Sequence, residues 1–268
     1  MSAAEYVHGY EARESERLVD QANVLARLLH SDTTYPAGAQ VLEAGCGVGA
    51  QTVTLARNSP DARFTSIDVS EESLAAARDL VVSRGITNVE FAKADIFDLA
   101  FAEASFDHLF VCFVLEHLAR PDEALMHLKT VLKPGGTITV IEGDHGSAYF
   151  HPDSRAARRA IQCLIELQTR SGGDSLIGRR LYPLLSDAGF RDVTVSPRVV
   201  YADASRPEMV EGFTKNTFTA MIEGVREEAL QAELTDEQTW AKGIADLYRA
   251  AEDDGTFSYT FFKALASK

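Results

Sequence analysis

The 268-residue sequence lacks several features that would point to a membrane or a nucleic acid. It has no hydrophobic run near the roughly 18 residues that a membrane-spanning helix requires. It also lacks any block of Lys or Arg, and its formal net charge is −14. That charge repels nucleic-acid phosphates and anionic lipid surfaces, so we expect neither as a partner. The N-terminal stretch is polar and acidic, and we expect no signal peptide there.

Cysteine is also scarce. The three cysteines, Cys46, Cys112 and Cys163, are widely spaced and odd in number. Their spacing provides neither a disulfide framework nor a set of zinc ligands, so we expect no metal site. This usage is typical of a reducing compartment and favours a cytoplasmic protein. The remaining composition, 46% hydrophobic and 25% charged, is ordinary for a globular chain with a large core.

Segments with strand and helix patterns alternate through the first half of the chain. The expected strands lie at 39–44, 63–67, 89–93, 106–113 and 137–142, and expected helices at 51–58, 70–84 and 121–132 separate them. Two later strands are expected at 191–196 and 256–265. This alternation predicts an α/β fold, in which a mostly parallel sheet carries helices on both faces.

We expect three regions along the chain. They are an N-terminal helical segment (1–38), a core (39–202 plus 255–268) and a helical lid (203–254) inserted between the sixth and seventh strands. The first region includes a helix at 11–30, preceded by residues 6–10, which are either a flap or a plain terminus. The lid contains helices at 207–230 and 235–251, the second opening with the capping box Thr235-x-x-Gln238.

A glycine motif follows the first expected strand and opens a helix. Glycines tolerate positive φ and let the backbone approach a ligand, and the helix N-terminus offers free N–H groups. The local pattern has two interpretations. Gly45-x-Gly47-x-x-Ala50 fits a dinucleotide-binding fingerprint, whereas Glu43-x-Gly45-x-Gly47-x-Gly49 fits the signature of class I S-adenosylmethionine-dependent methyltransferases.

Three further motifs, in the order expected, favour the second interpretation. They are Ile67–Ser70, then Ala94–Ile96 with Ser105–Leu109, and then Val114–Leu118 with Leu132–Gly136. Over roughly residues 39–145 the chain therefore resembles the small-molecule branch of the class I S-adenosylmethionine-dependent methyltransferases. A nicotinamide-dependent enzyme would explain the glycine motif and Asp68, but not the motifs around Asp95 and Gly135. The resemblance implies a Rossmann-like, seven-stranded sheet with an antiparallel last strand, S-adenosylmethionine as cofactor, and a small-molecule acceptor.

The strand ends carry residues whose chemistry suits this cofactor. Glu43 would attract the ammonium group, and Gly45, Gly47 and Gly49 would leave room for the methionine end. Asp68 would accept hydrogen bonds from the ribose hydroxyls, at the spacing from the glycines that this role requires. Asp95 would accept from the adenine amine, and Val69 or Ile96 would sandwich the ring. Cys112 lies, by the resemblance, near the transferring methyl group.

The acceptor is expected at the exit of the fifth strand, residues 142–147. There, His145 or Asp144 would orient or deprotonate the acceptor, although the same residues could form a plain polar loop. Glu142, Tyr149 and Phe213 are the expected acceptor-binding residues. Two other functions stay open, a nicotinamide-dependent oxidoreductase and a non-catalytic regulatory protein that binds the cofactor. The sequence predicts no particular acceptor and no oligomeric state.

Overall fold

The protein is represented by a computed structural model that describes residues 24–268. Residues 24–30 are helical, which is the part of the expected helix 11–30 that lies within the described range. The proposed flap at residues 6–10 lies outside it. Leu25 and Leu29 of this helix are fully buried, because they pack into the hydrophobic core on one side of the sheet.

Seven strands form one sheet in the order β3-β2-β1-β4-β5-β7-β6. Strand β7 runs antiparallel to both of its neighbours, and the remaining pairs are parallel. The predicted fold class is therefore confirmed. The strands are β1 (Gln40–Ala44), β2 (Arg63–Asp68), β3 (Val89–Lys93), β4 (Phe106–Cys112), β5 (Leu132–His151), β6 (Arg191–Ala202) and β7 (Thr256–Ser267).

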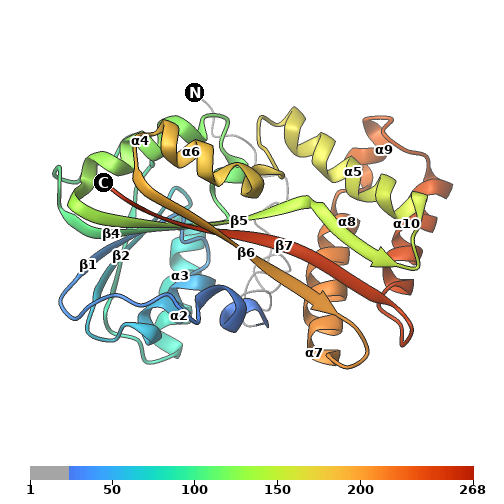
Figure 1. Cartoon of the computed structure of the whole chain (residues 1–268), viewed down its shortest axis with the longest axis horizontal. Coiled ribbons are helices and arrows are strands. Elements are labelled where there is room, and N and C mark those ends of the chain that lie inside the picture. The colour runs from blue at the N-terminus through green and yellow to red at the C-terminus, as the bar shows by residue number, and fades with distance from the viewer. Residues whose placement is uncertain (1–23) are drawn as a thin grey trace.

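Helices cover both faces of this sheet (Figure 1). Helices α2 (Ala50–Asn58) and α3 (Glu71–Ser83) lie on one face, and α4 (Pro121–Val131) and α6 (Leu181–Asp187) lie on the other. Successive strand side chains point to opposite faces, so Val41 and Leu42 of β1 enter two different hydrophobic cores. Ser70 caps α3 as expected, since its hydroxyl accepts a hydrogen bond from the backbone N–H of Ser73 at 3.2 Å.

Strand β5 is much longer than its sequence pattern predicts. The turn expected at residues 133–136 lies within the strand as an irregularity, where the pairing jumps from Phe106↔Leu132 to His108↔Thr137. The exit loop expected after Glu142 is wrong, because the strand continues to His151. Its backbone pairs with β7 at residues 142–144 and 149–151, and the residues between form an irregularity in which the His145 N–H donates to the carbonyl of Ser175 at 2.9 Å.

The far ends of β5, β6 and β7 extend into a second lobe (Figure 1). This lobe contains α5 (Arg155–Arg170), α8 (Ala220–Gly224), α9 (Arg226–Gln231) and α10 (Glu237–Arg249). The single helix expected at 207–230 is broken into α7 (Pro207–Met209), the π-helix η3 (Val210–Thr219), α8 and α9. Helix α10 is capped by Asp236 rather than by Thr235, since the Asp236 carboxylate accepts from the backbone N–H of Thr239 at 2.8 Å.

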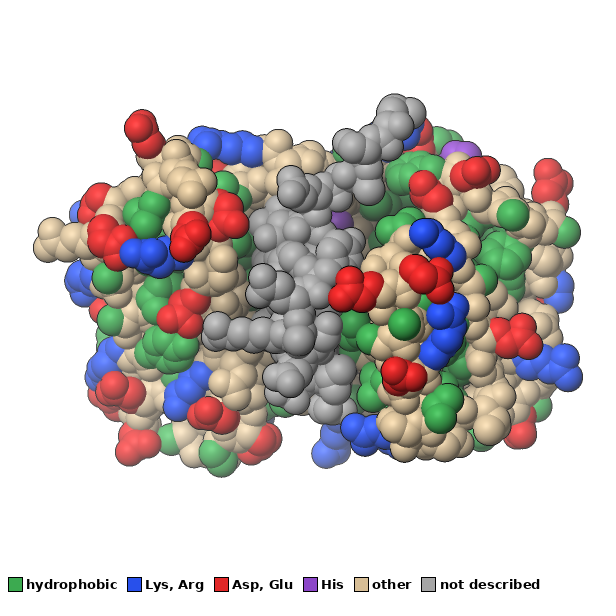
Figure 2. Space-filling model, turned by 180° about the vertical axis from the view of Figure 1, so that it is seen from behind, with side chains coloured by type: hydrophobic (Ala, Val, Ile, Leu, Met, Phe, Trp, Pro, Cys, Tyr) green, Lys and Arg blue, Asp and Glu red, His purple; other side chains and the backbone are tan. Residues whose placement is uncertain are grey.

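Acidic and basic side chains are interspersed over both lobes on the face seen in Figure 2. None of the helices within residues 24–268 has both the length and the apolar character needed to cross a bilayer.

Candidate active site

The glycine loop lies between the carboxyl end of β1 and the start of α2. Gly45, Gly47 and Gly49 all have positive φ, at 75°, 52° and 79°. A Cβ atom at Gly45 would lie 2.5 Å from Cγ2 of Val114, and one at Gly49 would lie 3.0 Å from Cβ of Ala77. A Cβ atom at Gly47 would meet no described atom within 4 Å. The loop is therefore tightly packed on two sides and open at Gly47, as backbone that approaches a ligand should be.

Asp68, at the end of β2, is joined to this loop. Its Oδ2 accepts from the backbone N–H of Gly47 at 2.8 Å, and its Oδ1 accepts from the N–H of Ser70 at 2.9 Å. Each carboxylate oxygen keeps a further lone pair for a ligand hydroxyl. The neighbouring Val69 side chain is 48% exposed, an apolar surface beside the carboxylate. Two of the residues predicted to contact the cofactor, Asp68 and Val69, thus lie next to the glycine loop.

The third strand end contributes Asp95 and Ile96, which differ in accessibility. Asp95 is exposed, and its Oδ1 accepts from the N–H of Phe97 at 2.9 Å. Ile96 is buried in the hydrophobic core on the α4 side of the sheet. Asp95 can therefore reach a ligand amine directly, whereas Val69 is better placed than Ile96 to offer an exposed apolar surface.

Glu43 lies beneath the loop rather than on its surface. The side chain is buried, and Oε2 accepts from the hydroxyls of Thr52 at 2.7 Å and Ser66 at 2.6 Å. Burial raises the pKa of Glu43 to about 7. The carboxyl thus links β1 to α2 and β2. Cys112 is also buried, and burial raises the pKa of its thiol, so it is a small apolar side chain and not a nucleophile.

The two predicted catalytic residues, Asp144 and His145, have different partners. The Asp144 carboxylate is buried and forms a bidentate ion pair with Arg179, at 2.7 Å to Nε and 2.6 Å to Nη2. His145 is buried as well, with Nδ1 lying 2.8 Å from the hydroxyl of Tyr259. Its ring contacts that of Phe218 in η3, at 6.3 Å between centroids. Asp144 is thus neutralised by a cation, whereas His145 faces a phenol and the second lobe.

The three predicted acceptor-binding residues have different surroundings. Tyr149 is 64% exposed on β5. Phe213 is buried in an aromatic cluster and lies 5.6 Å from Tyr259 between ring centroids, so it packs as a core residue. Glu142 is fully buried, and its Oε1 accepts from the backbone N–H groups of Val114 and Leu115 at 3.0 and 2.8 Å.

Sequence reasoning missed three residues at this end of the sheet. Tyr259 reads as plain core in an alternating strand, and Arg179 belongs to the short helix η2 (Ile177–Arg180), remote in sequence from Asp144. Phe113 has a φ of 58°, which is unusual for an aromatic residue and has no signature in the sequence.

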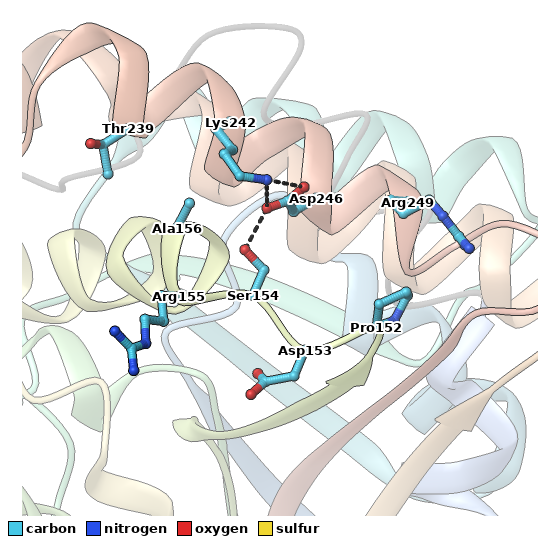
Figure 3. A pocket seen from close by; sticks show the side chains of 9 residues that line it. All are labelled: Pro152, Asp153, Ser154, Arg155, Ala156, Thr239, Lys242, Asp246 and Arg249. Atoms are coloured by element: carbon cyan, nitrogen blue, oxygen red, sulfur yellow. Dashed lines mark hydrogen bonds and ion pairs between the residues drawn. The ribbon is translucent and has the colours of Figure 1, made fainter.

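A separate hollow of about 530 Å³ lies between α5 and α10 in the second lobe (Figure 3). Both Lys242 and Ser154 bond to Asp246 there, and Arg249 pairs with Asp254 at 2.6 Å. None of the glycine-loop residues lines this hollow, so it is separate from the glycine loop. No cluster of three His, Cys, Asp or Glu side chains within residues 24–268 could hold a metal ion.

The strand order, the glycine loop after β1 and the acidic residues after β2 and β3 together define a class of protein. Residues 42–140 match the family model described as "Methyltransferase domain". By this match residues 42–140 form a methyltransferase domain, and the related proteins and folds support the class I S-adenosylmethionine-dependent type.

Several curated proteins are similar in sequence. An uncharacterized 37.1 kDa protein in transposon TN4556 of Streptomyces fradiae is 35% identical over 190 residues, which cover 70% of this chain and 54% of that protein. The O-methyltransferase resE of Aspergillus sclerotiorum is 29% identical, and the match covers 70% of this chain and 69% of that protein. The ubiquinone/menaquinone biosynthesis C-methyltransferase UbiE of Pseudomonas putida is 34% identical, and the match covers 40% of this chain and 42% of that protein. The chain thus spans about half of the Streptomyces fradiae protein, and it spans 35% and 45% of the length of two other relatives.

Solved structures share the fold at low sequence identity. The cyclase SpnF is 22% identical with a TM-score of 0.58, covering 92% of this chain and 81% of that one. Phosphoethanolamine N-methyltransferase 2 of Haemonchus contortus is 19% identical with a TM-score of 0.56, covering 92% and 52%. Because a cyclase and a methyltransferase share this fold, the fold does not by itself identify the reaction.

Proposed function

We propose that this protein transfers a methyl group from S-adenosylmethionine to a small-molecule acceptor by direct displacement. The observation that carries the proposal is the glycine loop, which is closed against Val114 and Ala77, open at Gly47 and joined to the carboxylate of Asp68. The family match over residues 42–140 supports it, as do the methyltransferase names of several relatives.

The donor would be held along the carboxyl ends of β1, β2 and β3. Bound S-adenosylmethionine supplies an electrophilic methyl group on a sulfonium. Asp68 would accept hydrogen bonds from the ribose hydroxyls, and the exposed Asp95 from the adenine amine. Val69 would cover the ring with its exposed side chain. Glu43 would act from below by fixing the strand that delivers the glycine loop.

The acceptor would lie near His145, where the middle of β5 faces Phe218 of η3. A displacement needs alignment, and a weakly acidic acceptor also needs a base. His145 is suited to orient or deprotonate an acceptor because Tyr259 fixes its Nδ1 side. Asp144 is better suited to hold this stretch of β5, through its ion pair with Arg179.

Calorimetry with S-adenosylhomocysteine and with NADPH, combined with a metabolite screen for S-adenosylhomocysteine release, tests the proposal. We expect binding of the first ligand, none of the second, and turnover with at least one acceptor. Binding of NADPH alone would favour an oxidoreductase. Binding of S-adenosylhomocysteine without turnover across a broad screen would favour a non-catalytic regulatory protein.

The role of His145 is tested by His145→Ala, with Asp144→Asn as the comparison. We expect His145→Ala to lower kcat by roughly 10²-fold or more while S-adenosylhomocysteine still binds with wild-type affinity. Wild-type turnover in His145→Ala would refute the role.

We also propose that the second lobe sets the choice of acceptor, because Phe218 of η3 contacts the His145 ring. Phe218→Leu is expected to change the ratio of kcat/KM between two acceptors while leaving donor affinity unchanged. An unchanged ratio across a panel of acceptors would argue against this assignment.

A further inference from the structure

The turn that follows β4 has a strained backbone and lies next to the glycine loop. Phe113 has a φ of 58°, a left-handed conformation that an aromatic residue adopts only when its surroundings impose it. Its N–H donates to the carbonyl of Ile141 in β5 at 2.9 Å. The short helix η1 (Leu115–His117) begins directly after Val114. Some other group must therefore stabilise this turn.

Glu142 is the side chain that does so. Its Oε1 accepts from two consecutive backbone N–H groups of the turn, Val114 at 3.0 Å and Leu115 at 2.8 Å. Glu142 is 0% exposed, and its Oε2 has no hydrogen-bond partner among the described residues. The contacts of this carboxyl that the structure describes are thus directed at the backbone of the turn.

The turn touches both halves of the site. The Val114 side chain forms the wall against Gly45, where an added Cβ would come within 2.5 Å of Cγ2. The Phe113 ring lies 5.3 Å from that of Phe261 in β7, which lies 4.8 Å from the ring of Tyr259. A shift of the turn would therefore displace the support of the glycine loop and disturb the packing next to Tyr259.

We propose that Glu142 is a positioning residue, which fixes the turn after β4 and through Val114 holds the glycine loop in its ligand-binding shape. This inference rests on the proposed function. It gives Glu142 a positioning role in place of the direct contact with the methyl acceptor that the sequence predicted. The positioning role requires an oxygen at Oε1 that accepts hydrogen bonds, and it does not require a negative charge on the carboxyl group. Burial and the neighbouring Glu116 raise the pKa of Glu142 well above its usual value, which agrees with a neutral carboxyl.

Three variants test the proposal by calorimetry with S-adenosylhomocysteine. Glu142→Gln keeps an oxygen at the same place, whereas Glu142→Ala removes it. Asp144→Asn is the matched control, because it alters another buried carboxylate of β5 that does not bond to the turn. We expect Glu142→Ala to raise Kd at least about tenfold, and Glu142→Gln and Asp144→Asn to stay within about threefold of wild type.

The outcomes separate this inference from the proposed function. Failure of the wild-type protein to bind would sink the function itself. Wild-type binding that Glu142→Ala retains, with only the KM of an acceptor raised, would return Glu142 to the acceptor site and overturn the positioning role. Equal losses in Glu142→Gln and Glu142→Ala would also overturn it, since charge would then be what matters. If Glu142→Ala fails to fold, Val114→Ala provides a second test, because it removes the side chain that supports Gly45. An unchanged Kd for S-adenosylhomocysteine in Val114→Ala would refute the proposal.

Discussion

Position 45 requires glycine for two independent reasons. Its φ of 75° is costly for any residue with a Cβ, and that Cβ would also collide with Val114. Gly38 has nearly the same φ, 78°, but a Cβ there would meet no described atom within 4 Å. The two positions therefore separate backbone strain from steric collision.

We predict that Gly45→Ala abolishes measurable binding of S-adenosylhomocysteine, whereas Gly38→Ala binds normally. Gly38→Ala should lose only about 1 kcal/mol of stability, the cost of a left-handed backbone. Calorimetry and urea unfolding of both variants provide the measurement. Equal binding in the two variants would contradict the assigned role of Val114.

The buried carboxyl group of Glu43 makes the stability of the protein depend on pH. Its pKa is about 7 in the folded protein against an ordinary value of 4.5, so between these pH values the native state binds more protons than the unfolded state. Its contribution is therefore fully present below pH 4.5 and is lost as the pH rises through about 7. The free energy of unfolding that Glu43 contributes, and that is lost over this pH range, is on the order of 3 kcal/mol.

Glu43→Gln removes the titrating group but keeps an acceptor for Thr52 and Ser66. We expect the fall in Tm between pH 4.5 and about 7 to be shallower in this variant than in the wild type. Thermal unfolding in matched buffers measures the two slopes. Parallel slopes would mean that Glu43 does not titrate in this window.

At the scale of elements, a buried lysine ties the N-terminal helix to the sheet. Lys263 of β7 donates to the carbonyl of Leu29 at 3.2 Å, to Asp32 Oδ1 at 2.6 Å and to Thr33 Oγ1 at 2.6 Å. The Lys263 side chain is 1% exposed and that of Asp32 is 49% exposed. Arg198 also pairs with Asp32. The buried cation thus depends on a carboxylate that water can reach.

We predict that Asp32→Asn destabilises the protein more than Lys263→Met does. The first change leaves a buried ammonium without its counter-ion, at a cost of about 2–3 kcal/mol, whereas the second removes the buried charge and leaves Asp32 with Arg198. Urea unfolding at one pH and salt concentration gives both values. The reverse order would show that the ion pair is not what holds the helix.

Strand β5 also shows what local patterns miss. Residues 142–147 contain two glycines and several polar side chains, a composition typical of a loop. They lie within a strand because β7, more than a hundred residues later, pairs with residues 142–144 and again with residues 149–151, on either side of an irregularity. The same pairing brings Tyr259 to His145, so neither the strand nor the contact could be predicted from residues near position 145.

For the whole molecule, the long strands join two lobes that could have been separate domains. β5 spans 20 residues and β7 spans 12, and each of these antiparallel strands extends through both the core and the second lobe (Figure 1). The single tryptophan, Trp240, is buried in the second lobe on α10. Because the lobes share sheet hydrogen bonds, we expect them to unfold together.

We predict that Trp240 fluorescence and far-UV circular dichroism report coincident transitions in urea. Fluorescence follows the second lobe alone, whereas circular dichroism follows the helices and strands of both. A fluorescence midpoint well below the circular dichroism midpoint would show that the second lobe unfolds independently.

The sequence alone determined the fold class and the ends of β1, β2 and β3, including Gly45, Asp68 and Asp95. These features depend on local periodicity and on glycines that must follow a strand, and nearby residues encode both. Only the tertiary structure decided the length of β5, the burial of Glu43 and Glu142, and the partners of Asp144 and His145. Burial and pairing depend on which distant segments pack together, so no local pattern contains them.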